Sequence, residues 1–288
     1  MKSFSPFRLW NEVLSLIQPA SPACPFCGKP VSYGAASSVR NIQPLLPAVF
    51  RRQVCASCIA GIPWVNRIVC PVCGRGEYCP DCPRRSRPHF VCNRSAVRYD
   101  DRMRGWLALY KYRGNEELEE RLADMLMPPL RQMALELGVR TAAPRGRKRA
   151  FGQAPDRVLF WDAVAYVPVS RERAAERGFN QAERLAQGLS ARTGLPVAHL
   201  LHRTRHSGKQ SFKTRGERME NTKELFRADP AAIAGLRPYG MQAVPSPVRL
   251  LLVDDIYTTG STMEACSAAL QQASPYPLRI YGLTWARS

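Results

Sequence analysis

Two adjacent carboxylates followed by a run of hydroxyl side chains form the pattern with the clearest chemistry in this chain. Asp254 and Asp255 end a short apolar run, Leu250 to Val253, and a turn with the sequence Thr258-Thr259-Gly260-Ser261-Thr262 follows. The run predicts a buried, parallel strand, and Met263 to Ala273 predicts a helix. Carboxylates accept hydrogen bonds from sugar hydroxyls, and a glycine-containing turn at a helix N-terminus presents N–H groups to a phosphate. The segment therefore predicts a site for a ribose 5-phosphate unit at the carboxyl end of a strand.

This segment resembles the phosphoribosyl-pyrophosphate (PRPP) signature of type I phosphoribosyltransferases, because strand, acid pair, threonine-glycine turn and helix occur in that order. The resemblance implies that Asp254 and Asp255 bind the ribose hydroxyls, that residues 258–262 bind the 5′-phosphate and that Mg²⁺ accompanies PRPP. A strand–turn–helix with an aspartate N-cap is the alternative. A cap accounts for one acid, however, and not for two.

A second candidate anion site follows another expected buried strand, Ala163 to Pro168. We expect a basic loop from Val169 to Gln181, followed by a helix from Ala182 to about Thr193. Arginines in such a loop could neutralise a pyrophosphate, and glycine and asparagine suit the turn and the helix cap. The candidate residues are Arg171, Arg173, Arg177, Gly178 and Asn180. A solvated arginine loop is the alternative.

Nine of the ten cysteines lie between Cys24 and Cys92, and eight of them form four C-x-x-C pairs. Two such pairs complete a tetrahedral four-cysteine zinc site, so four pairs predict two structural zinc ions. Disulfides are the alternative, but they require an oxidising compartment, for which the sequence gives no signal. Sequential pairing is the simplest arrangement, and a crossed one stays open. The ligands would then be Cys24, Cys27, Cys55 and Cys58 for one ion, and Cys70, Cys73, Cys79 and Cys82 for the other.

The chain is strongly basic, with 42 Lys and Arg against 23 Asp and Glu. Residues 1–95 hold 12 of these basic side chains and only 3 of the acidic ones. Arg84, Arg85 and Arg87 directly follow the last cysteine pair. This distribution favours a surface for a polyanion such as nucleic acid. A merely solvated basic face is the alternative.

Several other segments of the 288-residue chain have readable patterns. We expect a short amphipathic helix near residues 4–17, a helix from Gly105 to Gly114 and a longer one from Glu116 to Leu137. Residues 140–156 predict a flexible basic insertion, and residues 203–221 a mobile basic lid. No apolar run approaches the length of a membrane span, and no continuous signal-peptide core is present, so we expect a cytoplasmic protein without membrane insertion. The four histidines show no metal-ligand spacing, and we assign them no role.

The whole chain resembles the competence protein F family, also called ComF or ComFC. The resemblance rests on the cysteine pairs, on Leu109-Tyr-Lys-Tyr-Arg-Gly114 and Arg177-Gly-Phe-Asn-Gln-Ala182, on the basic lid and on Val253 to Thr262. It implies an α/β fold in which a double zinc-ribbon domain, residues 1–95, precedes a type I phosphoribosyltransferase domain with a Rossmann-like, mostly parallel sheet, residues 96–288. It also implies a role in internalising transforming DNA as single strands, alongside the ComFA helicase-like ATPase.

Two functions of different class remain open at this stage. The chain could be a competence factor that handles single-stranded DNA and has a pocket for PRPP or another 5-phosphoribosyl ligand. It could instead be a small-molecule or nucleotide phosphoribosyltransferase with no direct DNA role. The basic surface favours the first, and the intact acid pair and threonine-glycine turn favour the second. No side chain is identifiable as a general base, so the catalytic residues and the acceptor substrate stay unassigned.

Overall fold

A computed structural model describes residues 22–31, 46–84, 88–113, 116–138, 160–204, 225–236 and 247–288. Several predicted features lie outside these ranges. They are the N-terminal helix near residues 4–17, Arg85 and Arg87, the basic insertion 140–156 and the lid beyond Thr204. The expected role of these segments therefore stays a prediction.

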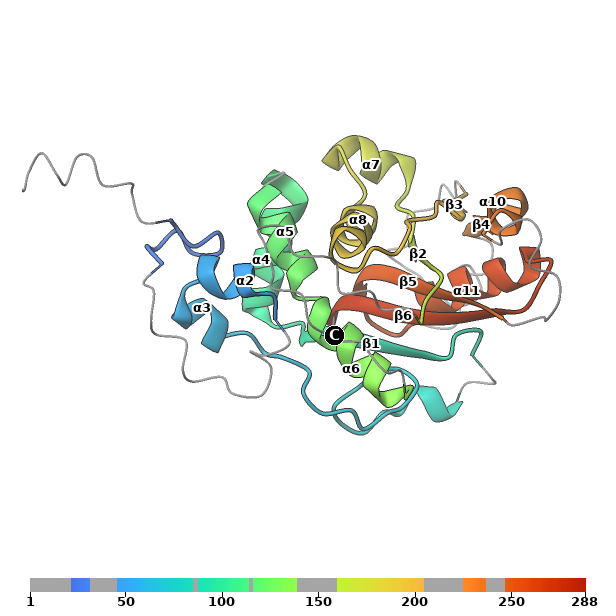
Figure 1. Cartoon of the computed structure of the whole chain (residues 1–288), viewed down its shortest axis with the longest axis horizontal. Coiled ribbons are helices and arrows are strands. Elements are labelled where there is room, and N and C mark those ends of the chain that lie inside the picture. The colour runs from blue at the N-terminus through green and yellow to red at the C-terminus, as the bar shows by residue number, and fades with distance from the viewer. Residues whose placement is uncertain are drawn as a thin grey trace, which may run out of the picture.

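The centre of the molecule is a four-stranded sheet in the order β1-β6-β5-β2 (Figure 1). Its strands are β1 (Cys92–Arg98), β2 (Ala163–Tyr166), β5 (Val248–Tyr257) and β6 (Leu278–Arg287). Every neighbouring pair is parallel, with Val253 opposite Tyr166 on one side and Leu283 on the other. The α/β class and the parallel sheet are thus as predicted. Because all four strands run the same way, their carboxyl ends share one edge of the sheet.

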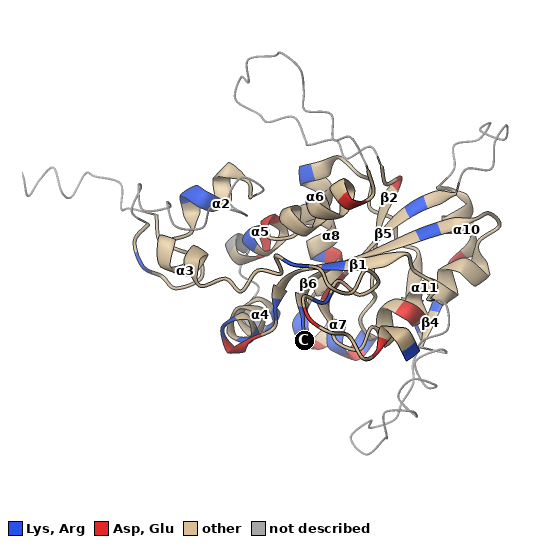
Figure 2. Ribbon diagram, turned by 90° about the horizontal axis from the view of Figure 1, so that it is seen from below, with Lys and Arg blue, Asp and Glu red and all other residues tan. Residues whose placement is uncertain are grey.

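Helices cover both faces of this sheet. The helices α5 (Glu116–Asp124), α6 (Met127–Glu136) and α8 (Gln181–Thr193) lie on one side, and α11 (Ser261–Ala273) lies on the other (Figure 2). Helix α8 packs on β2 and β5, α6 on β1, and α11 on β6. The central strand β5 is buried from Leu250 to Val253 because both of its faces are covered. Among the described helices, none is long and apolar enough to cross a membrane.

Two helix predictions were wrong in detail. The expected basic loop contains the helix α7 (Arg171–Arg177), because the side chain of Ser170 caps it by accepting from the N–H of Arg173. The expected single helix from Glu116 to Leu137 is two helices, α5 and α6. The break falls at Met125 and Leu126, immediately before two prolines at the start of α6, where proline is tolerated and an unbroken helix is not.

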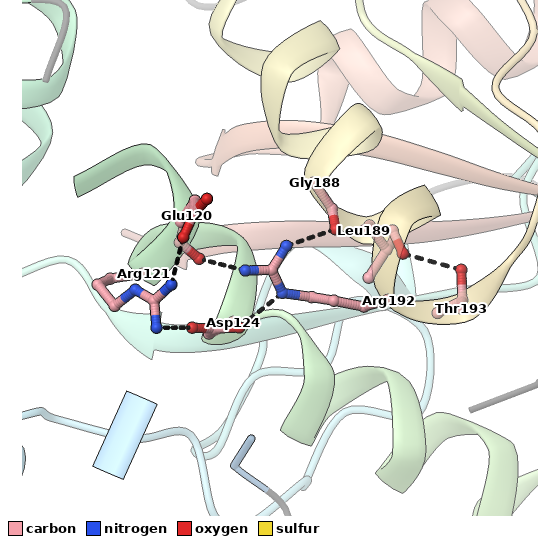
Figure 3. Close-up of polar contacts among 7 residues, drawn as sticks. All are labelled: Glu120, Arg121, Asp124, Gly188, Leu189, Arg192 and Thr193. Carbon is pink, nitrogen blue, oxygen red and sulfur yellow. Dashed lines mark hydrogen bonds and ion pairs between the residues drawn. The ribbon is translucent and has the colours of Figure 1, made fainter. Parts of the chain in front are cut away.

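Helices α5 and α8 are joined by an ion-pair cluster around a buried carboxylate (Figure 3). Asp124 forms ion pairs with two arginines: Arg192 Nε lies 2.6 Å from its Oδ1, and Arg121 Nη1 lies 2.8 Å from its Oδ2. Arg192 also donates to the carbonyls of Gly188 and Glu120. Burial raises the pKa of Asp124, and the two arginines oppose that shift. The cluster fixes α5 against the helix that covers β2 and β5.

The cysteine-rich segment packs directly on the α/β part. The ring of Phe26 stacks on Trp106 of helix α4 (Asp101–Arg113) with the centroids 3.7 Å apart. Trp64 forms an antiparallel bridge with Val97 of β1, and the N–H of Asn93 donates to the carbonyl of Val72 at 2.7 Å. The two four-cysteine clusters of this segment fit a double zinc ribbon. The predicted domain boundary after residue 95 falls within β1, and the division into two domains stays a prediction.

The remaining described elements are short. The helices α2 (Ala48–Gln53) and α3 (Ala56–Ala60) and the 3-10 helix η2 (Cys82–Arg84) belong to the cysteine-rich segment. The strands β3 (Leu201–Arg203) and β4 (Phe226–Ala228) form an antiparallel pair outside the main sheet. The helix α10 (Pro230–Ala234) follows β4 and contacts α11.

Candidate functional site

The acid pair lies at the carboxyl end of the central strand. Strand β5 continues through both aspartates to Tyr257, so the extended backbone is longer than the apolar run predicted. Asp254 Oδ1 accepts the N–H of Asp255 at 2.8 Å. Burial, and then the negative charge of Asp255, raise the pKa of Asp254 well above its ordinary value. Two carboxylates are thus held side by side in a half-buried position, where a hydroxyl donor or a cation would relieve their repulsion.

A lysine from a different part of the chain contacts this pair. Lys111 of α4 places its Nζ 2.5 Å from Asp255 Oδ2, and both side chains are largely shielded from solvent. The neighbouring Tyr110 fixes the helix, because its hydroxyl donates to the carbonyl of Gln181 at 3.1 Å at the start of α8. Helix α4 therefore supplies the cation that balances one of the two aspartates.

The predicted phosphate turn is formed by residues 258–262. Gly260 is buried with φ of 81°, and a Cβ there would collide with the ring of Tyr257, so this position requires glycine. Helix α11 starts at Ser261, and Thr259 Oγ1 lies 3.1 Å from Ser261 Oγ. The N–H groups of the first helical turn and these hydroxyls are donors of the kind that bind phosphate. Thr258 is exposed, and Thr262 is partly buried.

Only part of the predicted arginine site has the expected arrangement, namely the turn and the helix cap. Gly178 ends α7 with φ of 78°, and the side chain of Asn180 caps α8 by accepting the N–H of Ala182 at 3.0 Å, as predicted. Arg177 is engaged locally, because its Nη1 donates to Gln181 Oε1 at 2.9 Å. Arg171 and Arg173 are both exposed on α7.

A second cation with an electrostatic interaction with Asp254 comes from β3. Burial and the charge of Arg173 lower the pKa of Arg203, whereas Asp254 and Cys266 act in the opposite direction. Arg203 therefore interacts electrostatically with Asp254, and it is repelled by Arg173 of α7.

The eight paired cysteines form two compact clusters. Cys24, Cys27, Cys55 and Cys58 make one and Cys70, Cys73, Cys79 and Cys82 the other, with the sulfur atoms of each set within 4.8 Å of one another. Sequential pairing is thus the arrangement that the fold brings together. Burial opposes ionisation of Cys79, but hydrogen bonds from the backbone of Cys82 and Asp81 lower the pKa of its thiol to about 7. Four convergent thiols at this spacing fit a tetrahedral zinc ion, so each cluster could hold one.

The last predicted residues are at the edge of the second cluster. Arg84 is exposed at the end of η2, and Arg85 and Arg87 lie outside the described residues. Cys92 is buried, and its Sγ contacts Met133 Sδ at 3.7 Å, as expected for a cysteine that packs rather than binds metal. Two of the histidines do meet: His199 Nε2 is 3.3 Å from His202 Nδ1, and His199 Nδ1 is 2.5 Å from the hydroxyl of Tyr166.

Curated proteins with a similar sequence are competence proteins. Competence protein ComFC of Bacillus subtilis (strain 168) is 26% identical over 76% of this chain and 78% of its own length. Competence protein ComFC of Streptococcus pneumoniae (strain ATCC BAA-255 / R6) is 25% identical over 80% of this chain and 86% of its own. Competence protein F of Haemophilus influenzae (strain ATCC 51907 / DSM 11121 / KW20 / Rd) is 31% identical over 43% of this chain and 51% of its own. The resemblance to the competence protein F family is confirmed. No family model matches the chain.

Two residues near the acid pair were missed by sequence reasoning, although both lie in motifs that carry the resemblance to competence protein F. Lys111 is the centre of Leu109-Tyr-Lys-Tyr-Arg-Gly114, and Arg203 starts the basic lid. A lysine between two tyrosines on a helix is an unusual choice for a buried face, and this was the available signal. Its partner could not be inferred, because α4 and β5 are about half a chain apart.

Proposed function

We propose that this protein is a competence factor for natural transformation that handles internalised single-stranded DNA and has a pocket for PRPP or another 5-phosphoribosyl ligand. In this proposal Asp254 and Asp255 bind the ribose hydroxyls, and residues 258–262 bind the 5′-phosphate. Arg173, with Arg171 and Arg177 of the same helix, faces the pyrophosphate end. The competence role is supported by the names of the similar proteins, which are competence proteins.

One observation carries the pocket proposal. A half-buried pair of carboxylates lies at the carboxyl edge of a parallel sheet. Three residues after Asp255, a glycine-containing turn begins at Thr258 and leads into helix α11. A ligand that combines vicinal hydroxyls with a phosphate satisfies both halves at once. Mg²⁺ would arrive with PRPP and supply charge neutralisation to the pyrophosphate. The carboxylates, the hydroxyls and the nearby cations Lys111 and Arg203 fit such a ligand.

The chemistry that these residues can perform is binding and orientation. Transfer of a phosphoribosyl group needs stabilisation of an oxocarbenium-like state more than it needs a proton acceptor, and two carboxylates next to a ribose supply negative charge for that purpose. The intact acid pair and turn therefore also favour a second candidate, a small-molecule or nucleotide phosphoribosyltransferase with no direct DNA role. The acceptor of such a reaction stays unassigned.

The proposed setting is the cytoplasm, with a ComFA-type helicase as partner. All ten cysteines are free thiols in the structure, and eight of them stand in groups that suit zinc. Thiols in this arrangement are maintained in a reducing compartment. The ComFA partnership is carried by the family resemblance alone. We also propose the two-part division into residues 1–95, with the zinc clusters, and residues 96–288, with the ligand pocket.

Calorimetric titration tests the proposal. The full-length protein is titrated with PRPP and Mg²⁺, and separately with a single-stranded oligonucleotide. The competence-factor proposal expects both to bind. Binding of PRPP alone, together with release of pyrophosphate when candidate acceptors are added, would favour the transferase. Binding of DNA alone would leave the pocket without its proposed ligand.

A further inference from the structure

A cavity of about 400 Å³ opens where the loops of the second cysteine cluster meet the carboxyl ends of β1 and β6. None of residues 254–262 lines it, so it is separate from the acid pair and the phosphate turn. Its size is within the range of pockets that bind small organic ligands. The side chains that give the cavity its chemistry are Trp64, Arg67, Arg75, Arg98, Tyr99 and Arg287.

The cavity carries a net positive charge. Four arginines line it, against the side chain of Glu77 and the terminal carboxylate of Ser288. Arg75 has a long ion pair with Asp81, at 3.8 Å. Arg67 and Arg98 are exposed, and neither side chain forms an ion pair or hydrogen bond with another described residue. Several guanidinium groups directed to one hollow repel one another unless an anion lies between them.

Arg287 lines the cavity and is only 6% exposed. Its Nη1 donates to the carbonyl of Cys73 at 3.2 Å, its guanidinium carbon is 4.8 Å from the centre of the Tyr257 ring, and its Nε has no partner among the described residues. A buried cation with an unused donor favours a nearby anion. Arg287 also serves the cysteine cluster, since burial raises the pKa of Cys73 to about 11 and the charge of Arg287 opposes that shift.

The remaining walls are aromatic. Trp64 packs against β1 and is nearly buried, whereas Tyr99 is partly exposed and is held by the bond from its N–H to the carbonyl of Arg287 at 2.7 Å. Aromatic side chains next to guanidinium groups are the surroundings in which a base stacks while its phosphate is bound.

We propose that this cavity binds the phosphate monoester of a nucleotide, independently of any ligand at the acid pair. Arg67 and Arg98 contact the phosphate, Arg287 supplies charge from below, and Tyr99 offers a face to the base. The same chemistry could come from a free mononucleotide or from the phosphorylated end of a nucleic acid strand. The proposal does not depend on PRPP binding.

The probe is adenosine 3′-monophosphate, because it lacks the 5′-phosphate that the turn at residues 258–262 would bind. Calorimetric titration of the full-length protein should show binding of this nucleotide, and adenosine should bind at least about tenfold more weakly, because charge-assisted hydrogen bonds to the phosphate are lost. A thymidine pentanucleotide with and without a 3′-phosphate forms a second pair of ligands. The pocket is assigned to strand ends if the phosphorylated pentanucleotide binds more tightly than both the mononucleotide and the unphosphorylated pentanucleotide, and if R67Q/R98Q removes the difference between the two pentanucleotides. It is assigned to free nucleotides if the 3′-phosphate does not change the affinity for the pentanucleotide.

The variant R67Q/R98Q removes the two exposed arginines and leaves the buried Arg287 in place. We expect its affinity for adenosine 3′-monophosphate to fall by at least about tenfold. R227Q is the matched control, since Arg227 is an exposed arginine on β4, away from the cavity. D255N separates the two sites, and both control variants should bind as the wild type does.

Four results would overturn the proposal. Three are no binding of the nucleotide by the wild type, equal binding of adenosine and its monophosphate, and unchanged affinity in R67Q/R98Q. Loss of binding in D255N would also overturn it, because the nucleotide would then occupy the acid pair. Failure of PRPP to bind has no bearing on any of these outcomes.

Discussion

Among the described residues, Asp255 forms an ion pair with Lys111, and in the proposed complex it would also accept a ribose hydroxyl. Lys111 Nζ lies 2.5 Å from its Oδ2, which leaves the other carboxylate oxygen for a ribose hydroxyl. The lysine thus orients the carboxylate and balances its charge. A ligand hydroxyl that donates to an ionised acceptor gains more than one that donates to a neutral amide.

We predict that Asp255→Asn reduces the stabilisation of the protein by ribose 5-phosphate or by PRPP with Mg²⁺. A ligand that binds only the folded state raises the melting temperature, and loss of the charged acceptor costs about 1.5–3 kcal/mol of binding free energy. Thermal melts with and without ligand measure the shift. Asp101→Asn, at an exposed aspartate, is the control. An equal ligand-induced shift in wild type and Asp255→Asn would show that the acid does not bind the sugar.

In the protein without ligand, the carboxylate of Asp254 is expected to lower the free energy of unfolding, so its replacement should stabilise the protein. Its raised pKa means that the folded state favours the protonated form, so the free energy of unfolding falls as pH rises from the ordinary aspartate pKa, near 4, through the raised value. Asp254→Asn removes this cost, while the amide oxygen can still accept the N–H of Asp255. We therefore expect the variant to be more stable than the wild type at neutral pH, by about 1 kcal/mol.

Urea denaturation of wild type and Asp254→Asn at several pH values measures this difference. The gap in the free energy of unfolding should widen as pH rises through the pKa of Asp254 and then level off. A variant that is less stable than the wild type at neutral pH would mean that the carboxylate is favourably solvated or paired in the folded protein.

At the residue scale, the sequence predicted the parts of the candidate site that are contiguous. The acid pair, Gly260 and the cap at Asn180 are local features, and local geometry follows from residue type. Lys111 and Arg203 were not predicted as part of it. Each reaches the acid pair only through the tertiary arrangement of α4, β3 and β5, and a single sequence contains no information about such long-range contacts.

At the scale of elements, the buried runs were predictable and the boundaries were less so. The strand predicted at Leu250 to Val253 is the part of β5 that is buried on both faces, and the extension to Tyr257 depends on pairing with β6. The basic segment after β2 was expected to be a loop because it carries many charges. It is helical because Ser170 caps it and its alanines and glutamates favour a helix, and charge alone does not oppose that.

The cysteine clusters are elements that metal would hold together. We predict two zinc ions per chain, measured by elemental analysis of protein purified without added metal. The helices around them are short, three to six residues, so metal binding is expected to supply folding free energy. Cys79→Ser should reduce the content to about one ion, and Cys92→Ala should leave it at two, because Cys92 packs in the core. A wild-type value near one would eliminate the second site.

The contact between α5 and α8 gives a stability prediction with a control on the same helix. Arg192→Ala leaves Asp124 buried with Arg121 as its remaining charged partner, and removes donors to two carbonyls. We expect a loss of about 3 kcal/mol in the free energy of unfolding. Arg184→Ala should cost less than about 1 kcal/mol, since Arg184 is half exposed and its contact with Glu119 is 4.0 Å long. Equal losses in the two variants would show that the cluster contributes nothing beyond a surface ion pair.

At the scale of the whole molecule, the charge is unevenly distributed. Figure 2 shows a basic stretch on α2; its basic residues are Arg51 and Arg52, and no acidic residue belongs to that helix. The α/β part carries both signs, often paired, as in the cluster of α5 and α8. Residues 1–95 hold 12 basic side chains and 3 acidic ones, and this net positive charge attracts a polyanion.

We predict sequence-independent binding of single-stranded DNA that weakens steeply with salt, because each neutralised phosphate releases condensed counterions. Replacing Arg84, Arg85 and Arg87 by Ala should weaken binding to all sequences alike and flatten the salt dependence by up to roughly 2 units, at about 0.7 per contact. The basic insertion around Arg145 to Arg149 is expected to contribute the remainder.

Fluorescence anisotropy of labelled oligonucleotides at several salt concentrations measures both quantities on the full-length protein. The control replaces Arg104, Arg184 and Arg227 by Ala, which removes the same charge from the α/β part. Net charge alone would weaken both triple variants equally, whereas a DNA surface next to the zinc clusters would weaken the first far more. Both variants should keep their zinc and their response to PRPP, because those sites use other residues. If the wild type binds no oligonucleotide at low salt, the DNA-binding prediction is wrong. The basic surface would then be a solvated face or the docking site of a protein partner.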